Sequence, residues 1–260
     1  MQTLRFVDLE EARAAGGVRL LAAAALPSPW TEAAKGIFHV QQIPVLGVRF
    51  RRGDAAQAAW SGARNVPVVL FDHEPPRTGW AEILSLAERL GGAVSLVPAG
   101  VPERARLFGQ AHELAGENGL GWSARLIMIH GSLSSGGARS FPLAVAQYLA
   151  AQYGYAPERY APARARAVAI LAHFDHLLAD SRAAGHGYLL GDRLTALDIY
   201  LATFLTPIVG VTLDECPGIA PLVLPAFQHL GEVIGADLPP ALVEHRRKIY
   251  QQHLPWPIVL

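Results

Sequence analysis

The nine residues GDRLTALDI, from Gly191 to Ile199, contain the clearest structural signal in the sequence. Thr195 is a typical helix N-cap residue, and the acidic residue Asp198 follows three positions later, which is the spacing of a capping box. In such a box the threonine side chain accepts from the N–H of the third helical residue, and the acidic side chain accepts from the N–H of the N-cap. The stretch therefore predicts a helix from Thr195 to about Val209, and we assign Asp198 a structural role.

Helical periodicity continues on both sides of this box through the rest of the C-terminal part. Four further segments are predicted to be helical: Pro102 to about Ile129, Phe141 to Tyr153, Pro162 to Ala184, and a last helix from Pro239 or Pro240 to His253. No convincing strand pattern remains after residue 102. Residues 103–260 are therefore predicted to form an all-helical domain.

The N-terminal part follows a different pattern, in which short apolar runs alternate with helical segments. The expected elements are strands at Val18 to Ala25, Val45 to Phe50 and Pro67 to Phe71, and helices at Pro29 to about Gln42, Asp54 to Trp60 and Trp80 to Leu90. This order predicts an α/β domain over residues 17–91, preceded by an N-terminal extension of residues 1–16. Segment 92–102, which contains Gly, Ser and Pro, is expected to link the two domains.

The composition excludes several classes of protein. Of the 260 residues, 51% are hydrophobic and only 17% are charged, which indicates a folded chain with much surface buried between domains or subunits. Basic and acidic residues balance at 22 each, so we expect no nucleic-acid partner. No apolar run approaches the roughly 20 residues that span a bilayer, so we expect no membrane partner either.

The single cysteine, Cys216, excludes an intrachain disulfide and a multi-cysteine zinc site. We interpret it as a small buried hydrophobe. A reducing, cytoplasmic location fits this cysteine usage. The near absence of lysine, together with the abundance of alanine, suggests a bacterial genome of high GC content.

Two further motifs precede GDRLTALDI along the chain. Ser28-Pro29-Trp30 lies at a predicted strand-to-helix turn, and Asn65-Val66-Pro67-Val68-Val69-Leu70 leads into the third predicted strand. In their order and spacing the three motifs resemble those of the glutathione transferase superfamily, and the resemblance covers roughly residues 17 to 210. It implies a thioredoxin-like α/β N-terminal domain followed by an all-α helical bundle domain.

The resemblance also implies a role for each motif. Ser28 would be the catalytic residue, because a hydroxyl that donates a hydrogen bond to a bound sulfur favours the thiolate over the thiol. The bond between Val66 and Pro67 would be cis, and the backbone of Val66 would pair with the cysteinyl part of glutathione. By residue type alone, Ser28 is equally an N-cap or turn serine, and Pro67 an ordinary trans proline that opens an edge strand.

The chain departs from the family pattern after the third strand. Where the family usually has Glu-Ser or Gln-Ser at a helix N-terminus, this sequence has Arg77-Thr78. Thr78 can replace the serine hydroxyl beside a ligand carboxylate. Arg77 would repel the ammonium group of glutathione and would favour a ligand with more negative charge, such as an organic acid; alternatively, it is a solvated surface residue.

The sequence thus predicts an enzyme similar to glutathione S-transferases, with glutathione as co-substrate and a hydrophobic electrophile as acceptor. Substrate binding is assigned to six residues around catalytic Ser28: Val66, Pro67, Arg77, Thr78, Trp30 and Trp122. The tryptophans are equally interpreted as core residues. Two alternatives stay open, a non-catalytic binding or dimerisation module of the same fold and an enzyme of this scaffold acting on another carboxylate ligand. The resemblance implies a homodimer. His173 and His176 are three positions apart on a predicted helix, and without a third ligand in the sequence no metal is expected.

Overall fold

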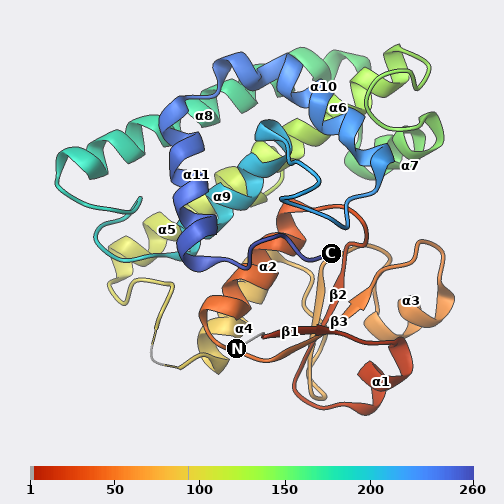
Figure 1. Ribbon diagram of the computed structural model, residues 1–260, viewed down its shortest axis with the longest axis vertical. Coiled ribbons are helices and arrows are strands. Elements are labelled where there is room, and N and C mark those ends of the chain that lie inside the picture. The colour runs from red at the N-terminus through yellow and green to blue at the C-terminus, as the bar shows by residue number, and fades with distance from the viewer. Residues whose placement is uncertain (1–2, 93) are drawn as a thin grey trace.

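The computed structural model describes residues 3–92 and 94–260. An α/β domain formed by the N-terminal part lies against a bundle of helices formed by the C-terminal part (Figure 1). The strands are β1 (Leu4–Phe6), β2 (Val18–Ala22), β3 (Val45–Arg49) and β4 (Val68–Phe71). The helices are α1 (Leu9–Ala14), α2 (Pro29–Val40), α3 (Ala55–Ser61), α4 (Trp80–Leu90), α5 (Val101–Ala115), α6 (Leu120–Ser134), α7 (Leu143–Tyr153), α8 (Tyr160–Ala183), α9 (Ala196–Val209), α10 (Leu224–Ile234) and α11 (Pro240–His253).

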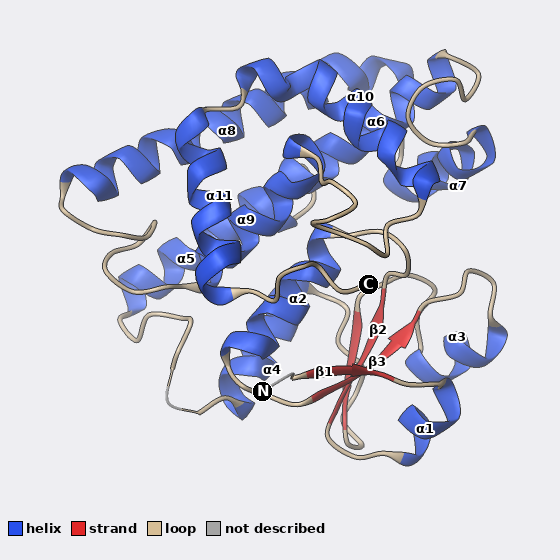
Figure 2. Cartoon of the chain, viewed as in Figure 1, coloured by secondary structure: helices blue, strands red, loops and turns tan. Residues whose placement is uncertain are grey.

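The sheet has the strand order β1-β3-β2-β4, in which β1, β3 and β2 are parallel and β4 runs antiparallel to β2. Helices α2 and α4 cover one face, toward the helical domain, and α1 and α3 cover the other (Figure 2). Strand β2 supplies both faces because its side chains alternate: Leu20 packs in the main core and Leu21 in the smaller core under α1 and α3. The α/β domain followed by a helical domain confirms the predicted fold class.

The N-terminal extension of residues 1–16 contributes to the sheet domain. Leu4–Phe6 pairs with Val45–Gly47 as the edge strand β1, and α1 follows it, with the side chain of Asp8 accepting from the N–H of Glu11. Neither element has an apolar run long enough to stand out in the sequence. Within residues 17–91, the predicted helices and strands are found with ends shifted by a few residues. The strand predicted from Val18 to Ala25, for example, ends at Ala22.

The helical domain differs from expectation at two places. The segment from Pro102 to Ile129, predicted as one helical stretch, is divided into α5 and α6. The chain turns between them at Asn118, whose φ of 60° is left-handed, and α6 restarts after Gly119. Helix α10 was not predicted, because Pro221 and Pro225 mark its start as a turn in the sequence although Pro225 lies in the tolerant first turn.

The GDRLTALDI stretch forms the predicted capping box at the start of α9. The Oδ2 atom of Asp198 accepts from the Thr195 N–H at 2.9 Å and from the Thr195 hydroxyl at 2.9 Å. Its Oδ1 atom accepts from the N–H of Leu189 at 3.0 Å and from Nε2 of His245, on α11, at 2.9 Å. All these groups are buried, so one carboxylate joins α9, α11 and the loop that precedes α9.

Helix α9 is buried along almost its whole length and packs against α2, α5, α10 and α11. The two domains are therefore joined through α2 and α9. After α11 the chain returns to the α/β domain as residues 254–260, which we call the C-terminal strap (Figure 1). Arg49 of β3 donates from Nη2 to the Leu260 carbonyl oxygen at 2.7 Å. In the described residues, no helix has both the length and the apolar character needed to cross a bilayer.

Candidate functional site

A cleft of about 590 Å³ lies between the two domains and brings together six of the seven predicted site residues. These six, which line it from β2, α2, β4, α4 and α6 or the loops beside them, are Ser28, Trp30, Val66, Pro67, Thr78 and Trp122. Arg77 is not among the lining residues. Such a concave site at a domain boundary is the usual place for a small-molecule ligand.

Ser28 lies at the turn from β2 into α2, with Pro29 in the first helical position. Its carbonyl oxygen accepts from the N–H of Glu32 at 2.8 Å, as an N-cap residue should. The hydroxyl makes no capping bond, and it has no hydrogen-bond partner within the described residues. The backbone of Ser28 is thus fixed by the start of α2, and its hydroxyl stays free to bond to a ligand in the cleft.

The Val66–Pro67 peptide bond is cis, as the resemblance implies. Strand β4 begins at Val68, so Val66 precedes the residues that pair with β2. Neither the N–H nor the C=O of Val66 takes part in a hydrogen bond within the described residues. The cleft therefore has an unpaired backbone donor and acceptor beside Pro67, which is the arrangement that an extended peptide ligand can use.

Thr78 lies exposed just before α4, whose N-cap is Gly79. The N–H of Gly79 donates to Oε2 of Glu82 at 3.1 Å, so part of the first helical turn is already bonded to a carboxylate. The Thr78 hydroxyl remains the polar group that this end of α4 contributes to the cleft.

Arg77 contacts a neighbouring carboxylate and does not face the ligand cleft, where its place in the sequence suggested it would lie. Its guanidinium forms an ion pair with Glu74, which also accepts from Arg89 at 2.7 Å. Hydrogen bonds from Arg89 and Arg77 hold the pKa of Glu74 below its ordinary value. The backbone of Arg77 pairs in both directions with Val69 at 2.9 Å. The charge of Arg77 is thus matched by a neighbouring carboxylate outside the cleft.

The two tryptophans of the prediction both combine packing with cleft lining. Trp30 meets Phe204 of α9 edge to face at 4.9 Å and donates from Nε1 to the Ala115 carbonyl at 2.8 Å, which fixes α2 to the end of α5. Trp122 of α6 packs against Tyr153 of α7 at 4.6 Å between ring centres. Its Nε1 is buried without a hydrogen-bond partner in the described residues.

The cleft also contains charged residues that sequence reasoning missed. Arg52, Arg64 and Arg125 line it, with Glu117 as the acidic residue among the lining side chains. They come from the loop before α3, the loop before β4 and α6, and no local motif unites them. The one available signal was the spacing of Arg125 three residues after Trp122, which places both on one face of a helix.

Within the described residues, the side chains near this site include neither a metal-binding cluster nor a reactive thiol. In residues 3–92 and 94–260, no group of three or more His, Cys, Asp and Glu side chains is arranged to hold a metal ion. Cys216 is fully buried, and burial is the main cause that raises the pKa of its thiol to about 11. Its thiolate is therefore scarce at neutral pH.

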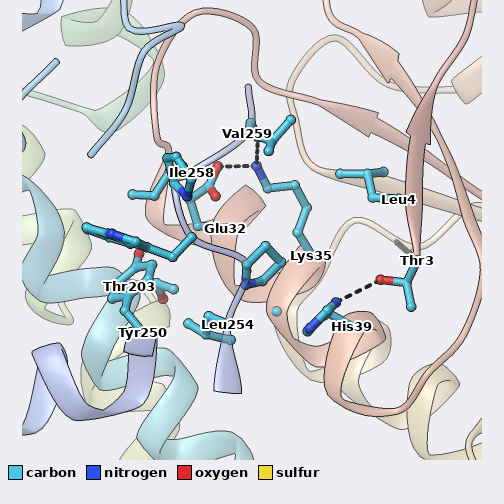
Figure 3. A pocket seen from close by; sticks show the side chains of 14 residues that line it. Thr3, Leu4, Glu32, Lys35, His39, Thr203, Tyr250, Leu254, Ile258 and Val259 are labelled. Atoms are coloured by element: carbon cyan, nitrogen blue, oxygen red, sulfur yellow. Dashed lines mark hydrogen bonds and ion pairs between the residues drawn. The ribbon is translucent and has the colours of Figure 1, made fainter. Parts of the chain in front are cut away.

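A second cavity, of about 260 Å³, lies between α2, α11 and the C-terminal strap (Figure 3). Glu32 and Lys35 of α2 form a buried ion pair beside it, with 2.7 Å between Lys35 Nζ and Glu32 Oε1. Lys35 also donates to the Val259 carbonyl of the strap, and His39 bonds to Thr3 at the other end of the cavity (Figure 3). Burial raises the pKa of Glu32, and Lys35 opposes that rise.

The sequence and the fold are both similar to known proteins. Residues 157–230 match the family model of the glutathione S-transferase C-terminal domain. No curated protein matches the chain. A solved structure of a glutathione S-transferase domain-containing protein from Marinobacter aquaeolei VT8 has 16% identity and a TM-score of 0.59, over 90% of this chain and 98% of that one.

Two further solved structures show the same fold. A beta-etherase from Sphingobium sp. strain SYK-6 has 14% identity and a TM-score of 0.57, over 89% of this chain and 99% of that one. A glutathione S-transferase from Methylobacterium radiotolerans JCM 2831, in complex with glutathione sulfonate, has 17% identity and a TM-score of 0.54, over 94% and 97%. Residues 157–230 thus match the glutathione S-transferase C-terminal domain, and the chain as a whole has the fold of solved glutathione S-transferases.

Proposed function

We propose that the protein binds glutathione in the interdomain cleft and joins it through its sulfur to a hydrophobic electrophile. The observation that carries this proposal is the combination of an unpartnered Ser28 hydroxyl with the unpaired backbone of Val66 before a cis proline. The first group suits a sulfur atom, and the second suits the peptide-like part of the same ligand. Thr78 at the start of α4 suits a ligand carboxylate.

In this proposal the chain supplies position and a hydrogen bond, and glutathione supplies the nucleophilic sulfur. The Ser28 hydroxyl donates to the sulfur and so stabilises the thiolate, while the thiol proton passes to solvent. The sulfur then forms a bond to the electrophilic carbon, and the leaving group departs with the electron pair. No general base is required beside Ser28.

Removal of the Ser28 hydroxyl tests the proposal. A hydrogen bond to a charged group contributes about 1.5–3 kcal/mol, so Ser28→Ala is expected to lower kcat/KM about tenfold or more at neutral pH and to raise the pKa of the bound thiol by about 1 unit or more. The ultraviolet absorbance of the thiolate, followed against pH, measures the second effect.

The matched control for this test is Ser134→Ala, which removes an exposed hydroxyl on α6 that bonds only to the His130 carbonyl. It should leave both readouts unchanged. Glutathione that binds without any turnover of an electrophile, or turnover that is equal in Ser28→Ala, would contradict the proposal and favour the non-catalytic module.

The ion pair of Arg77 leads to a second prediction. Because its guanidinium faces Glu74 outside the cleft, Arg77→Ala is expected to change the affinity for glutathione by no more than about twofold. Thr78→Val, which removes a hydroxyl of the cleft, is expected to weaken binding about tenfold. Isothermal titration compares the two variants, and a tenfold gain in affinity in Arg77→Ala would mean that the arginine does repel the ligand.

The homodimer and the cytoplasmic location stay predictions.

A further inference from the structure

Two buried donors that belong to cleft-lining residues lack acceptors. The Nε1 atom of Trp122 and the Nε atom of Arg125 are shielded from solvent, and neither has a hydrogen-bond partner in the described residues. Both residues belong to α6, both line the cleft, and they are separated by three positions, so they lie on one face of the helix. Buried donors are nearly always paired in native proteins, and several buried polar atoms of the described residues lack a partner. This pair differs from the others in that both residues line the cleft.

The charge around these donors is positive. Arg52, Arg64 and Arg125 line the cleft, and none of them forms an ion pair in the part of the chain that the structure describes. Glu117 is the acidic residue of the lining, and it is exposed. What distinguishes these three arginines is that they line one cleft together. The three unmatched cations favour an anionic ligand.

The walls of the same region are aromatic. The guanidinium of Arg52 lies 4.3 Å from the ring centre of Tyr148, and that of Arg125 lies 5.4 Å from Phe141 and 5.7 Å from Tyr153. The guanidinium groups of both arginines therefore lie over aromatic rings, and the second face of each guanidinium can stack on a planar ligand. A planar ring suits such a wall because aromatic groups stack on one another and on guanidinium planes.

We propose that the electrophile taken by the cleft is an aromatic carboxylate. Its carboxylate accepts from Trp122 Nε1 and from Arg125, and its ring packs among Phe141, Tyr148 and Tyr153. This inference names the acceptor of the proposed function and rests on it. For an aromatic chloride the sulfur bonds to the carbon that bears chlorine, and chloride leaves with the electron pair.

A pair of compounds that differ only in charge tests this specificity. The probes are 4-chloro-3-nitrobenzoate and the neutral 4-chloro-3-nitrobenzamide, each titrated calorimetrically into the full chain without glutathione. We expect the benzoate to bind the wild type at least about tenfold more tightly than the benzamide. In Arg125→Gln and in Trp122→Phe the preference should fall to about twofold or less.

The matched control is Arg104→Gln. Arg104 is exposed on α5 and lies 5.0 Å from the ring centre of Phe108, so it stacks on an aromatic ring as Arg125 does but outside the cleft. It should retain the wild-type preference. Circular dichroism shows which variants are folded, and Trp122→Phe tests the proposal by itself if Arg125→Gln does not fold. Equal binding of the two probes to the wild type would overturn the inference, as would a preference that persists in Trp122→Phe.

Turnover with glutathione separates this inference from the proposed function. Catalysed rates are divided by the uncatalysed rates, since the two probes differ in intrinsic reactivity. A wild type that conjugates both probes with equal enhancement would overturn the anion preference and support the transferase. A wild type that binds the benzoate selectively but conjugates neither probe would contradict the transferase and support the carboxylate site as a site for another reaction.

Discussion

Asp198→Ala is expected to lower the free energy of unfolding by about 4 kcal/mol, because it leaves several buried donors without an acceptor. The carboxylate accepts from the backbone N–H groups of Leu189 and Thr195, from the Thr195 hydroxyl and from Nε2 of His245. Asp198 is 0% and His245 1% exposed, so water cannot replace the lost bonds. Urea denaturation of the wild type and the variant measures the difference.

Two further variants sharpen that measurement. Asp198→Asn keeps the shape and one carbonyl oxygen, so its loss should be smaller than that of the alanine variant. Asp192→Ala is the control, since Asp192 is largely exposed and bonds to His186 on the surface; we expect an effect below about 0.5 kcal/mol. If Asp198→Ala lost less than about 1 kcal/mol, the carboxylate would not be the junction between α9 and α11 that its contacts indicate.

Lys35→Met is expected to cost about 3 kcal/mol of unfolding free energy, because it leaves the carboxylate of Glu32 buried without its cation. The side chains of Glu32 and Lys35 are only 6% and 9% exposed. The double variant Glu32→Gln with Lys35→Met removes both charges and should recover more than half of the loss. Lys248→Met is the comparison variant: Lys248 is half-buried, forms no ion pair in the described residues and, like Lys35, donates to a backbone carbonyl, that of Gly187.

The pH dependence of this loss has a definite sign. Burial raises the pKa of Glu32 above its ordinary value of 4.5, so the group contributes stability below that value and the contribution is lost as the pH rises through the folded-state pKa. Removal of Lys35 raises that pKa further. The deficit of Lys35→Met should therefore be largest near neutral pH and shrink as the pH falls toward 4.5. A deficit that is constant with pH would show that packing, and not charge, causes the loss.

The features that the sequence predicted well are those governed by local rules. Thr195 and Asp198 are three positions apart, and that spacing alone determines the capping box. The bond between Asp198 and His245 joins residues 47 positions apart, and no local pattern reports it. The division at Asn118 has a different cause: Gly116, Asn118 and Gly119 are a local turn signal, but the apolar periodicity that continues through α5 and α6 outweighed it in the sequence analysis.

The candidate site divides in the same way. Ser28 and Val66 belong to motifs whose backbone conformation is set by adjacent prolines, so their place in the cleft followed from the resemblance. Arg52 and Arg125 reach the cleft only through packing of the two domains. Arg77 was interpreted from the acidic position of the family pattern that it replaces, whereas its charge pairs with Glu74, three positions earlier.

The three-residue strand β1 has a consequence for the solubility of the sheet. Without it, the five residues of β3 would present an unpaired row of backbone donors and acceptors at the margin of the sheet. Such a row can pair with the same row of another molecule, and a very short final strand offers little backbone for that pairing. Strand β1 therefore protects the edge of β3 from intermolecular strand addition, a role separate from ligand binding in the cleft.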